Sequence, residues 1–531
     1  MPVYAPRGAV ATSQPLATAA GLVALRRGGS AVDAALAAAV ALTVVQPGSN
    51  GIGGDLFAIV WDGTRLHGLN ASGRSPAALT RDIVGAGVPA PPSHGGAQAV
   101  APALPSRGWL PVTVPGAPAG WRDLHARFGR LPFAVLFDDA IAYAAGGFPV
   151  SPRVATAWGS SVALHASLGD APELAEFAKV FTVDGGRAPR AGERWSNPDM
   201  ARTLGLIAET GAGAFYTGEI AVALDAYARS TGGLLTGDDL AAHASVWVEP
   251  VPASYRGHEV WELPPNGQGI AASVALSILD GFDLAAIAPE ERLHRRIEAI
   301  KLGFADAHRC VADPSCAPDV TGLLAADRVG VLRASIGDRA APGVGEPARG
   351  GTVYLCAADA DGTMVSLIQS TYLGFGSHVV LPGYGFGLQN RGVGFSLDPA
   401  HPNVVAPGKR PYHTIVPAFL TRAGAPVGPF GVMGGHLQPQ GHVQVVGATL
   451  DDGMDPQEAL GAPRWYWHAG RSVRLEPGLA WAATDLARRG HEVEIDADPS
   501  AYGYGQAIWR LPDGGYVAGS EPRADGCAMG Y

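Results

Sequence analysis

A Gly-Gly-Thr junction is the place in this 531-residue chain where residue types and their order could do covalent chemistry. Thr352 directly follows Gly350 and Gly351 and opens the apolar run 352–358. If the Gly351–Thr352 bond were cut, the Thr352 hydroxyl would gain a general base in its own new α-amine, which titrates at roughly 7.7–8.0 when unperturbed. Thr352 could make this cut itself by attacking the Gly351 carbonyl, since glycine tolerates the backbone geometry required. On spacing alone, the same junction is more commonly an ordinary loop before a strand.

Other catalytic and ligand-binding motifs are absent from the sequence. It contains no GxxxxGK[ST], HExxH or GxSxG pattern, and the glycines of 383–387 have the wrong spacing for a dinucleotide loop. The 15 histidines are scattered without ligand spacing, and the four cysteines include no CxxC pair. We therefore expect neither a metal nor a cofactor.

Composition and charge exclude several classes of protein and of binding partner. Gly (73) and Pro (43) are abundant, but 47% hydrophobic residues supply a large core and exclude disorder. The net charge is −10 and the sequence has no basic run, so it offers no positively charged segment for binding nucleic acid. The longest apolar stretch, 34–45, is too short to span a bilayer, and the amino terminus has no secretory pattern. We expect a soluble cytoplasmic protein that acts without nucleic acid or membrane.

The cysteines favour buried free thiols over a disulfide framework, although Cys310 and Cys316 are spaced so that they could be bridged.

Helical patterns dominate the region before the junction. Residues 15–27 have helical spacing and end at Gly28, and Ser30 with Asp33 is a capping-box pattern that opens a second helix to about Thr43. A glycine-rich loop and a strand follow at 46–54 and 56–61. The rest is expected to comprise a surface excursion at 84–118, mostly helix over 121–332 with a strand pair near 253–263, and a linker at 333–351.

After the linker the pattern changes to strands. Residues 352–358 and 363–370 flank a turn and predict a hairpin. Strand-like runs are expected to continue to Gly431, followed by an amphipathic helix over about 438–450 and short strands near the end.

The chain resembles the γ-glutamyltranspeptidase family of N-terminal-nucleophile (Ntn) hydrolases over nearly its whole length. The landmarks that carry the resemblance are 29–35, 46–54, 114–120, 215–218, 264–269, 306–309, 313–314, 407–411, 455–459, 462–464, 521–523 and 530–531. The resemblance implies an α/β fold, a four-layer αββα sandwich. It also implies self-cleavage into a large portion, 1–351, and a small portion, 352–531, which together form one αββα unit. The fragments would stay together as a heterodimer, with a dimer of heterodimers left open, and the amide chemistry would need no metal or cofactor.

The resemblance also assigns catalytic roles. Thr352 stands at the family's nucleophile position, with the cleavage site between Gly351 and Thr352. Ser370 stands where the family has a Thr whose hydroxyl bonds the nucleophile. Gly434 and Gly435 fall on the oxyanion glycines, whose alternative role is a tight turn.

Positions that bind the γ-glutamyl group in the family differ here. Ser72 replaces the Arg that holds the α-carboxylate, and Arg74 lies two residues along, on the opposite side of an extended segment. Arg391 and Gly394 replace an amide or acid and an Asp that hold the α-amino group. The other candidate substrate contacts are Tyr372, His413, Thr414 and His436, of which His413-Thr414 replaces a Ser-Ser pair and His436 begins the replacement of a Ser-Arg pair.

These replacements indicate a different substrate class. A guanidinium repels an α-ammonium but suits a carboxylate, so Arg391 without an Asp at Gly394 favours an anionic amide that lacks a free α-amino group. A surface ion pair remains the alternative role for Arg391. We expect Arg391 to serve the substrate alone, with self-cleavage using only Thr352 and its near neighbours.

The function hypothesis is therefore a self-processed amidohydrolase that cleaves a small anionic, oxamate-like amide through an acyl-enzyme. The motifs at 388–392 and 434–440 resemble the oxamate-amidohydrolase-like branch of the family. Two alternatives stay open: a true γ-glutamyltransferase or glutathione hydrolase, and an unprocessed, non-catalytic member.

Overall fold

The fold is given by a computed structural model, which describes residues 1–87, 104–343 and 350–531. Residues 88–103 of the predicted excursion at 84–118 and residues 344–349 of the predicted linker at 333–351 lie outside the described residues.

Two seven-stranded sheets form the centre of the molecule. The first sheet has the order β19-β2-β10-β11-β3-β4-β7, and the second has the order β1-β18-β17-β13-β12-β9-β8. The strands of the first sheet are β19 (Cys527–Gly530), β2 (Ala9–Thr12), β10 (Gly351–Ala358), β11 (Met364–Tyr372), β3 (Asp55–Trp61), β4 (Leu66–Ala71) and β7 (Val246–Val248). Those of the second are β1 (Val3–Ala5), β18 (Tyr516–Ser520), β17 (Tyr504–Arg510), β13 (Ala425–Met433), β12 (Ala418–Arg422), β9 (His258–Glu262) and β8 (Val251–Tyr255).

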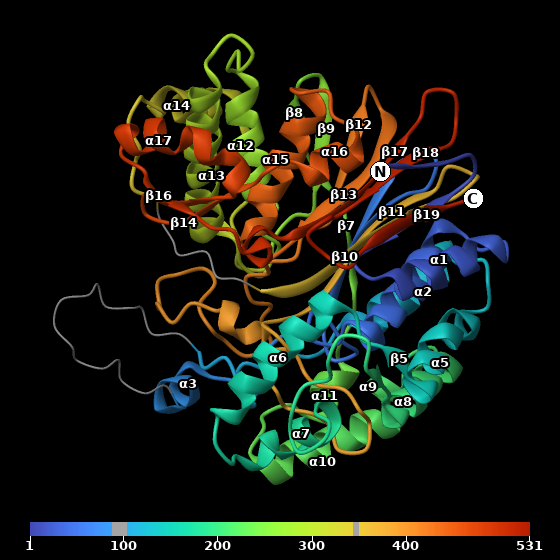
Figure 1. The fold of residues 1–531 in the computed structure, drawn as a ribbon. Helices are drawn as coiled ribbons and strands as arrows, with labels where there is room; N and C mark the ends of the chain where they lie inside the picture. Colours follow the sequence, from blue (N-terminus) through green and yellow to red (C-terminus); the bar gives the residue numbers. More distant parts are fainter. Residues whose placement is uncertain (88–103, 344–349) are drawn as a thin grey trace.

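Helices cover the outer face of each sheet, so the predicted four-layer αββα sandwich is confirmed. Helices α1 (Pro15–Arg26) and α2 (Ala31–Val45) pack on the first sheet, and α12 (Ile270–Asp280) and α15 (Leu437–Leu450) pack on the second (Figure 1). Strands β10 and β11 contact β13 across the interface between the sheets. The core therefore has one apolar layer between the sheets and one beneath each helical layer.

The remaining helices surround these layers. They are α3 (Arg81–Gly87), α4 (Ala117–Phe128), α5 (Asp138–Gly146), α6 (Pro152–Ala166), α7 (Ala175–Phe181), α8 (Pro198–Thr210), α9 (Gly213–Tyr216), α10 (Glu219–Thr231), α11 (Gly237–Ala241), α13 (Pro289–Cys310), α14 (Ala326–Ser335), α16 (Pro456–Gly461) and α17 (Ala483–Arg489). Small sheets are formed by β14 (Trp465–Ala469), β15 (Ser472–Leu475) and β16 (Glu492–Ile495), and by β5 (Phe148–Pro149) and β6 (Arg194–Trp195). No helix in the described part of the chain combines the length and apolar character needed to cross a membrane.

Local sequence signals account for the elements next to the junction. Ser30 accepts a hydrogen bond from the Asp33 amide and Asp33 accepts one from the Ser30 amide, which is the predicted capping box of α2. The predicted hairpin is β10 and β11, in which Gly351 pairs with Tyr372. The strand pair predicted near 253–263 is β8 and β9.

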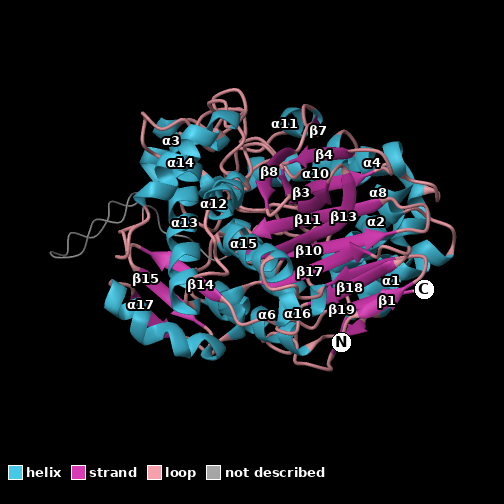
Figure 2. Ribbon diagram, turned by 90° about the horizontal axis from the view of Figure 1, so that it is seen from above, coloured by secondary structure: helices cyan, strands magenta, loops and turns pink. Residues whose placement is uncertain are grey.

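The two portions on either side of the junction are interleaved within one sheet. Strand β10 lies between β2 and β11. Strand β11 lies between β10 and β3 (Figure 2). Strands from residues before Thr352 therefore flank the hairpin that Thr352 opens.

Two expectations about the back of the chain were wrong. Between β11 and β12 the chain forms loops, isolated bridges and the short 3-10 helix Arg391–Gly394 rather than further strands. Helix α15 is buried on nearly all sides rather than amphipathic, because it lies beneath other elements of the second half. The expected free thiols are confirmed for all four cysteines, but only Cys310 and Cys356 are buried, whereas Cys316 is exposed and Cys527 is half-buried.

Candidate active site

Thr352 lies at the start of β10, buried beside Ser370 of β11. Its hydroxyl donates a hydrogen bond to Ser370 Oγ at 3.2 Å. Ser370 Oγ in turn donates to the carbonyl oxygen of Gly351 at 2.7 Å. The Thr352 hydroxyl and the carbonyl of the bond preceding it are thus joined through one side chain, whose contact with Thr352 is the one the resemblance implied.

Two further groups donate to the same Ser370 oxygen. The Tyr372 amide lies 2.8 Å from Ser370 Oγ, and Nη2 of Arg391 lies 3.1 Å from it. Tyr372 can reach back because its backbone turns into the left-handed region, with φ of 79°. A hydroxyl oxygen has two lone pairs, so three donors crowd it and favour negative charge on it.

Arg391 is completely buried beside this group, which removes the surface ion pair as its role. Its Nη1 donates to Thr414 Oγ1 at 2.8 Å, and its guanidinium carbon lies 4.3 Å from the centre of the Tyr372 ring. Nε has no partner among the described atoms, and no described carboxylate lies within ion-pair distance of the guanidinium. Burial lowers the pKa of Arg391 to about 10, so the side chain is a cation at neutral pH.

Gln268 connects Thr414, the hydrogen-bond partner of Arg391, to the proposed oxyanion turn. Sequence reasoning did not single out Gln268. Gln268 Nε2 donates to the carbonyl oxygens of Thr414, at 2.7 Å, and Gly435, at 3.0 Å. Its Oε1 accepts from the Tyr412 hydroxyl at 2.9 Å. Thr352 is therefore connected to Gly435 by a continuous series of hydrogen bonds that passes through the Thr414 residue. The only sequence signal was the family landmark 264–269 that contains Gln268.

The Gly434-Gly435 turn joins β13 to the first turn of α15. Gly434 has φ of 135° and Gly435 has φ of 65°, a pair of conformations that residues with a Cβ rarely adopt. The carbonyls of these glycines accept from the amides of Leu437 and Gln438 at the helix start. The turn thus lies at the positive end of a helix of 14 residues, an environment suited to a developing oxyanion.

A second buried network surrounds His413. Asp55 Oδ2 lies 3.0 Å from His413 Nε2, and Asp55 Oδ1 accepts from Gln389 Nε2 at 2.9 Å. The Ile415 amide donates to His413 Nδ1, so the ring carries its proton on Nε2. Burial, reinforced by the charge of Arg391, lowers the pKa of His413 to about 4 and keeps the ring neutral. Asp55 was also missed, and its only signal was its position at the end of the loop 46–54.

The other predicted substrate contacts lie in different surroundings. Ser72 donates to Asn70 Oδ1 at 2.7 Å and is fully buried. Arg74 is 46% exposed and pairs with Asp313 at 2.9 Å. His436 packs against the rings of Phe304, His308 and Tyr412.

Gly394 cannot be replaced by a larger residue without a shift of the backbone. A Cβ added there would lie 2.4 Å from the Tyr412 carbonyl oxygen. The absence of an Asp at this position therefore reflects how closely this loop approaches the segment that contains His413 and Thr414.

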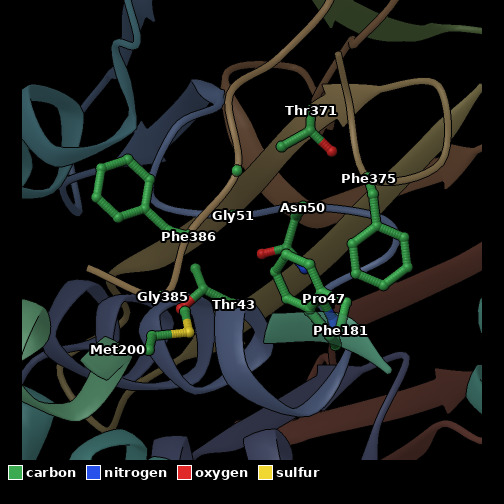
Figure 3. Close-up of a pocket in the computed structure, with 11 residues that line it drawn as sticks. Thr43, Pro47, Asn50, Gly51, Phe181, Met200, Thr371, Phe375, Gly385 and Phe386 are labelled. Atoms are coloured by element: carbon green, nitrogen blue, oxygen red, sulfur yellow. The ribbon is translucent and has the colours of Figure 1, made fainter. Parts of the chain in front are cut away.

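A small cavity lies on the other side of β11 from Ser370. Thr371, Asn50 and Gly51 border it on one side, and Phe375 and Phe386 contribute aromatic side chains (Figure 3). Its volume of about 10 Å³ is room for about one water molecule, so it cannot take an amide substrate.

One buried cluster of the described residues has metal-binding side chains. Atoms of His294, Glu298 and His491 lie within 4.8 Å of one another. However, His294 Nδ1 and His491 Nε2 bond each other at 2.8 Å, and Lys301 Nζ lies 2.7 Å from Glu298 Oε1. Because an ammonium already neutralises the carboxylate, we interpret the cluster as hydrogen-bonded support. It holds the segment before the junction, since His294 Nε2 donates to the Gly337 carbonyl and the Ala341 amide donates to Glu298.

Comparison with known proteins places this geometry in a family. The family model described as Gamma-glutamyltranspeptidase matches residues 17–531. A glutathione hydrolase-like YwrD proenzyme of Bacillus subtilis is 36% identical, with 97% of each chain covered. An oxamate amidohydrolase proenzyme of Klebsiella pneumoniae is also 36% identical, with 97% of each chain covered. Among solved structures, a cephalosporin acylase from Bacillus halodurans is 47% identical and superposes with a TM-score of 0.94 over 100% of this chain and 97% of that one.

Proposed function

The chain belongs to the gamma-glutamyltranspeptidase family and is an amide-cleaving enzyme of the Ntn-hydrolase class, and on this basis we propose that Thr352 is its nucleophile and a small carboxylate-bearing amide its substrate. Oxamate represents this class of substrate.

Maturation is the first step of the proposed function. Cleavage between Gly351 and Thr352 would produce a large portion, 1–351, and a small portion, 352–531. The portions would remain associated, because β10 and β11 are hydrogen-bonded to β2 and β3 on either side. The proenzyme descriptions of two relatives support this step.

In the mature enzyme, the α-amine of Thr352 would take the proton from its own hydroxyl as that oxygen attacks the substrate carbonyl. The oxygen of the tetrahedral intermediate would face the turn at Gly434 and Gly435, where each amide donor contributes on the order of 3 kcal/mol. Loss of the amine gives an acyl-enzyme, and water then releases the acid.

The observation that carries the substrate class is the environment of Arg391. A fully buried guanidinium with no described carboxylate within ion-pair distance lies one side chain away from the Thr352 hydroxyl. Burial of an unpaired charge is costly, and a substrate carboxylate would supply the missing partner. An α-ammonium group would instead be repelled, and the close approach of Gly394 to Tyr412 leaves no room there for an acidic residue that would bind one.

Glutathione hydrolysis is the second candidate function, because one relative is described as glutathione hydrolase-like. It would require the glutamyl ammonium and carboxylate to be held by residues other than those at Ser72, Arg391 and Gly394.

Intact-mass measurement and a panel of amides test the proposal. We expect freshly purified wild-type protein to separate into two masses that correspond to 1–351 and 352–531, and Thr352→Ala to remain whole. The processed enzyme should release ammonia from oxamate and act poorly on a γ-glutamyl anilide. A single wild-type mass would remove Thr352 as the nucleophile, whereas efficient γ-glutamyl transfer to a dipeptide would establish the second candidate function.

A further inference from the structure

We propose that Arg391 is also a positioning residue for self-cleavage, acting through Ser370 on the Gly351–Thr352 bond. This inference rests on the proposed role of Thr352 and departs from the sequence-based expectation that Arg391 serves only the substrate. The same guanidinium would then act in two successive reactions, first in self-cleavage and afterwards in cleavage of the substrate amide.

The hydrogen bonds around Ser370 supply the geometry. Ser370 Oγ accepts from Thr352 Oγ1 at 3.2 Å and from Arg391 Nη2 at 3.1 Å, and it donates to the Gly351 carbonyl oxygen at 2.7 Å. The attacking hydroxyl, the relaying hydroxyl and the carbonyl that is attacked are therefore already connected. Arg391 is the one charged group that contacts this relay in the described part of the chain.

The step balances as an acyl shift from nitrogen to oxygen. Thr352 Oγ1 forms a bond to the Gly351 carbonyl carbon and passes its proton to Ser370 Oγ, while Ser370 passes its own proton to the former carbonyl oxygen. The C–N bond then breaks, and the proton on that oxygen moves to the nitrogen, which becomes the free α-amine of Thr352. The resulting ester between Gly351 and Thr352 is hydrolysed by water, which leaves a Gly351 carboxylate and a free Thr352 hydroxyl.

Arg391 helps because Ser370 Oγ carries partial negative charge as its own proton leaves for the Gly351 carbonyl oxygen ahead of the arrival of the Thr352 proton. A cation 3.1 Å away stabilises that charge strongly in a site with no water-exposed side chains. Thr414 Oγ1 accepts a hydrogen bond from Nη1, the other terminal nitrogen of the guanidinium, at 2.8 Å. This bond fixes the direction of the Nη2 donor. Arg391 remains protonated throughout, so it is not consumed by the first reaction and is available to a substrate carboxylate afterwards.

The experiment follows the conversion of purified precursor to two fragments over time. We expect Arg391→Met to slow maturation by roughly 100-fold, the scale observed when one donor to a developing oxyanion is removed. Arg391→Lys should recover part of the rate because it keeps the charge without the fork. Arg256→Met is the control: Arg256 is less buried than Arg391 and is hydrogen-bonded to Asp451 and two backbone carbonyls, but it makes none of the contacts around Ser370. It should mature at the wild-type rate.

A double-mutant cycle separates action through Ser370 from a general loss of stability. If Arg391 acts through Ser370, adding Arg391→Met to Ser370→Ala should slow maturation little beyond Ser370→Ala alone. Folded Arg391→Met protein that matures at the wild-type rate would overturn the inference, and so would slowing that adds fully to that of Ser370→Ala. Neither result would affect the assignment of Thr352, which falls only if Thr352→Ala is still cleaved.

Discussion

Asp55 and His413 form a completely buried pair, with Asp55 Oδ2 3.0 Å from His413 Nε2. Asp55 pairs with Ser370 in the register of β3 and β11, and Thr414, next to His413, bonds Arg391. The pair therefore fixes the segment that holds the guanidinium to the strand next to β11. Its carboxylate also favours the charged state of Arg391.

Replacing Asp55 by Asn should lower the free energy of unfolding by about 2 kcal/mol, the cost of leaving a buried polar group unpaired. The new amide oxygen can satisfy Gly73 and Gln389, but its NH₂ then faces the Nε2–H of His413. If the His413 proton moved to Nδ1, that N–H would instead face the Ile415 amide, which is also a donor. Urea unfolding of Asp55→Asn in a Thr352→Ala background measures the effect. Asp361 is 65% exposed and pairs with Arg130 at the surface, so Asp361→Asn should change stability by less than about 0.5 kcal/mol.

Replacing Gly394 by Asp should not restore γ-glutamyl specificity. Its Cβ would lie 2.4 Å from the Tyr412 carbonyl oxygen, so we expect a loss of about 1–3 kcal/mol of stability. Arg391 would still repel an α-ammonium. Thermal unfolding and turnover of a γ-glutamyl anilide test both points, with Gly330→Asp, where a Cβ meets open space, as the control. A stable Gly394→Asp enzyme that gains γ-glutamyl turnover would contradict this explanation of specificity.

Local signals predicted the scaffold better than the site. The capping box at Ser30 and the hairpin at Thr352 involve neighbours in sequence, and both are present. Thr352 and Ser370 were singled out as candidates because a glycine junction and a family resemblance pointed to them. Asp55 could not be paired with His413 from the sequence, because 358 residues separate them.

The surroundings of Arg391 likewise could not be predicted, because they form only when the chain folds. The sequence indicated a cation near the substrate, but it could not distinguish a surface ion pair from burial against Ser370, Thr414 and Tyr372. Gln268 was inconspicuous for the same reason, since it bonds to Gly435 across 167 residues.

Gly435→Ala should lower turnover of oxamate by about 10- to 100-fold, because a small displacement of the oxyanion turn misplaces its donors. An alanine at φ of 65° also costs roughly 1–2 kcal/mol in stability. Gly453→Ala is a matched control, because Gly453 has φ of 69° in open space and lies in a turn after α15. Equal losses of stability with a loss of kcat only in Gly435→Ala would support the oxyanion role. Equal kcat values would leave Gly434 and Gly435 as a structural turn.

Acidification should destabilise the protein partly through His491, and His491→Gln should reduce that loss. Burial lowers the pKa of His491 to about 3, with Lys301 reinforcing the effect, whereas an unfolded histidine titrates near 6.5. Because the unfolded chain binds this proton first, the stabilisation is complete above about pH 6.5 and is lost progressively as the pH falls toward 3. A glutamine amide can still donate to His294 Nδ1 but does not titrate. Urea unfolding at pH 7.5 and pH 5 in the Thr352→Ala background should therefore show a smaller difference for His491→Gln than for the parent. An undiminished difference in His491→Gln would assign the acid sensitivity to other groups.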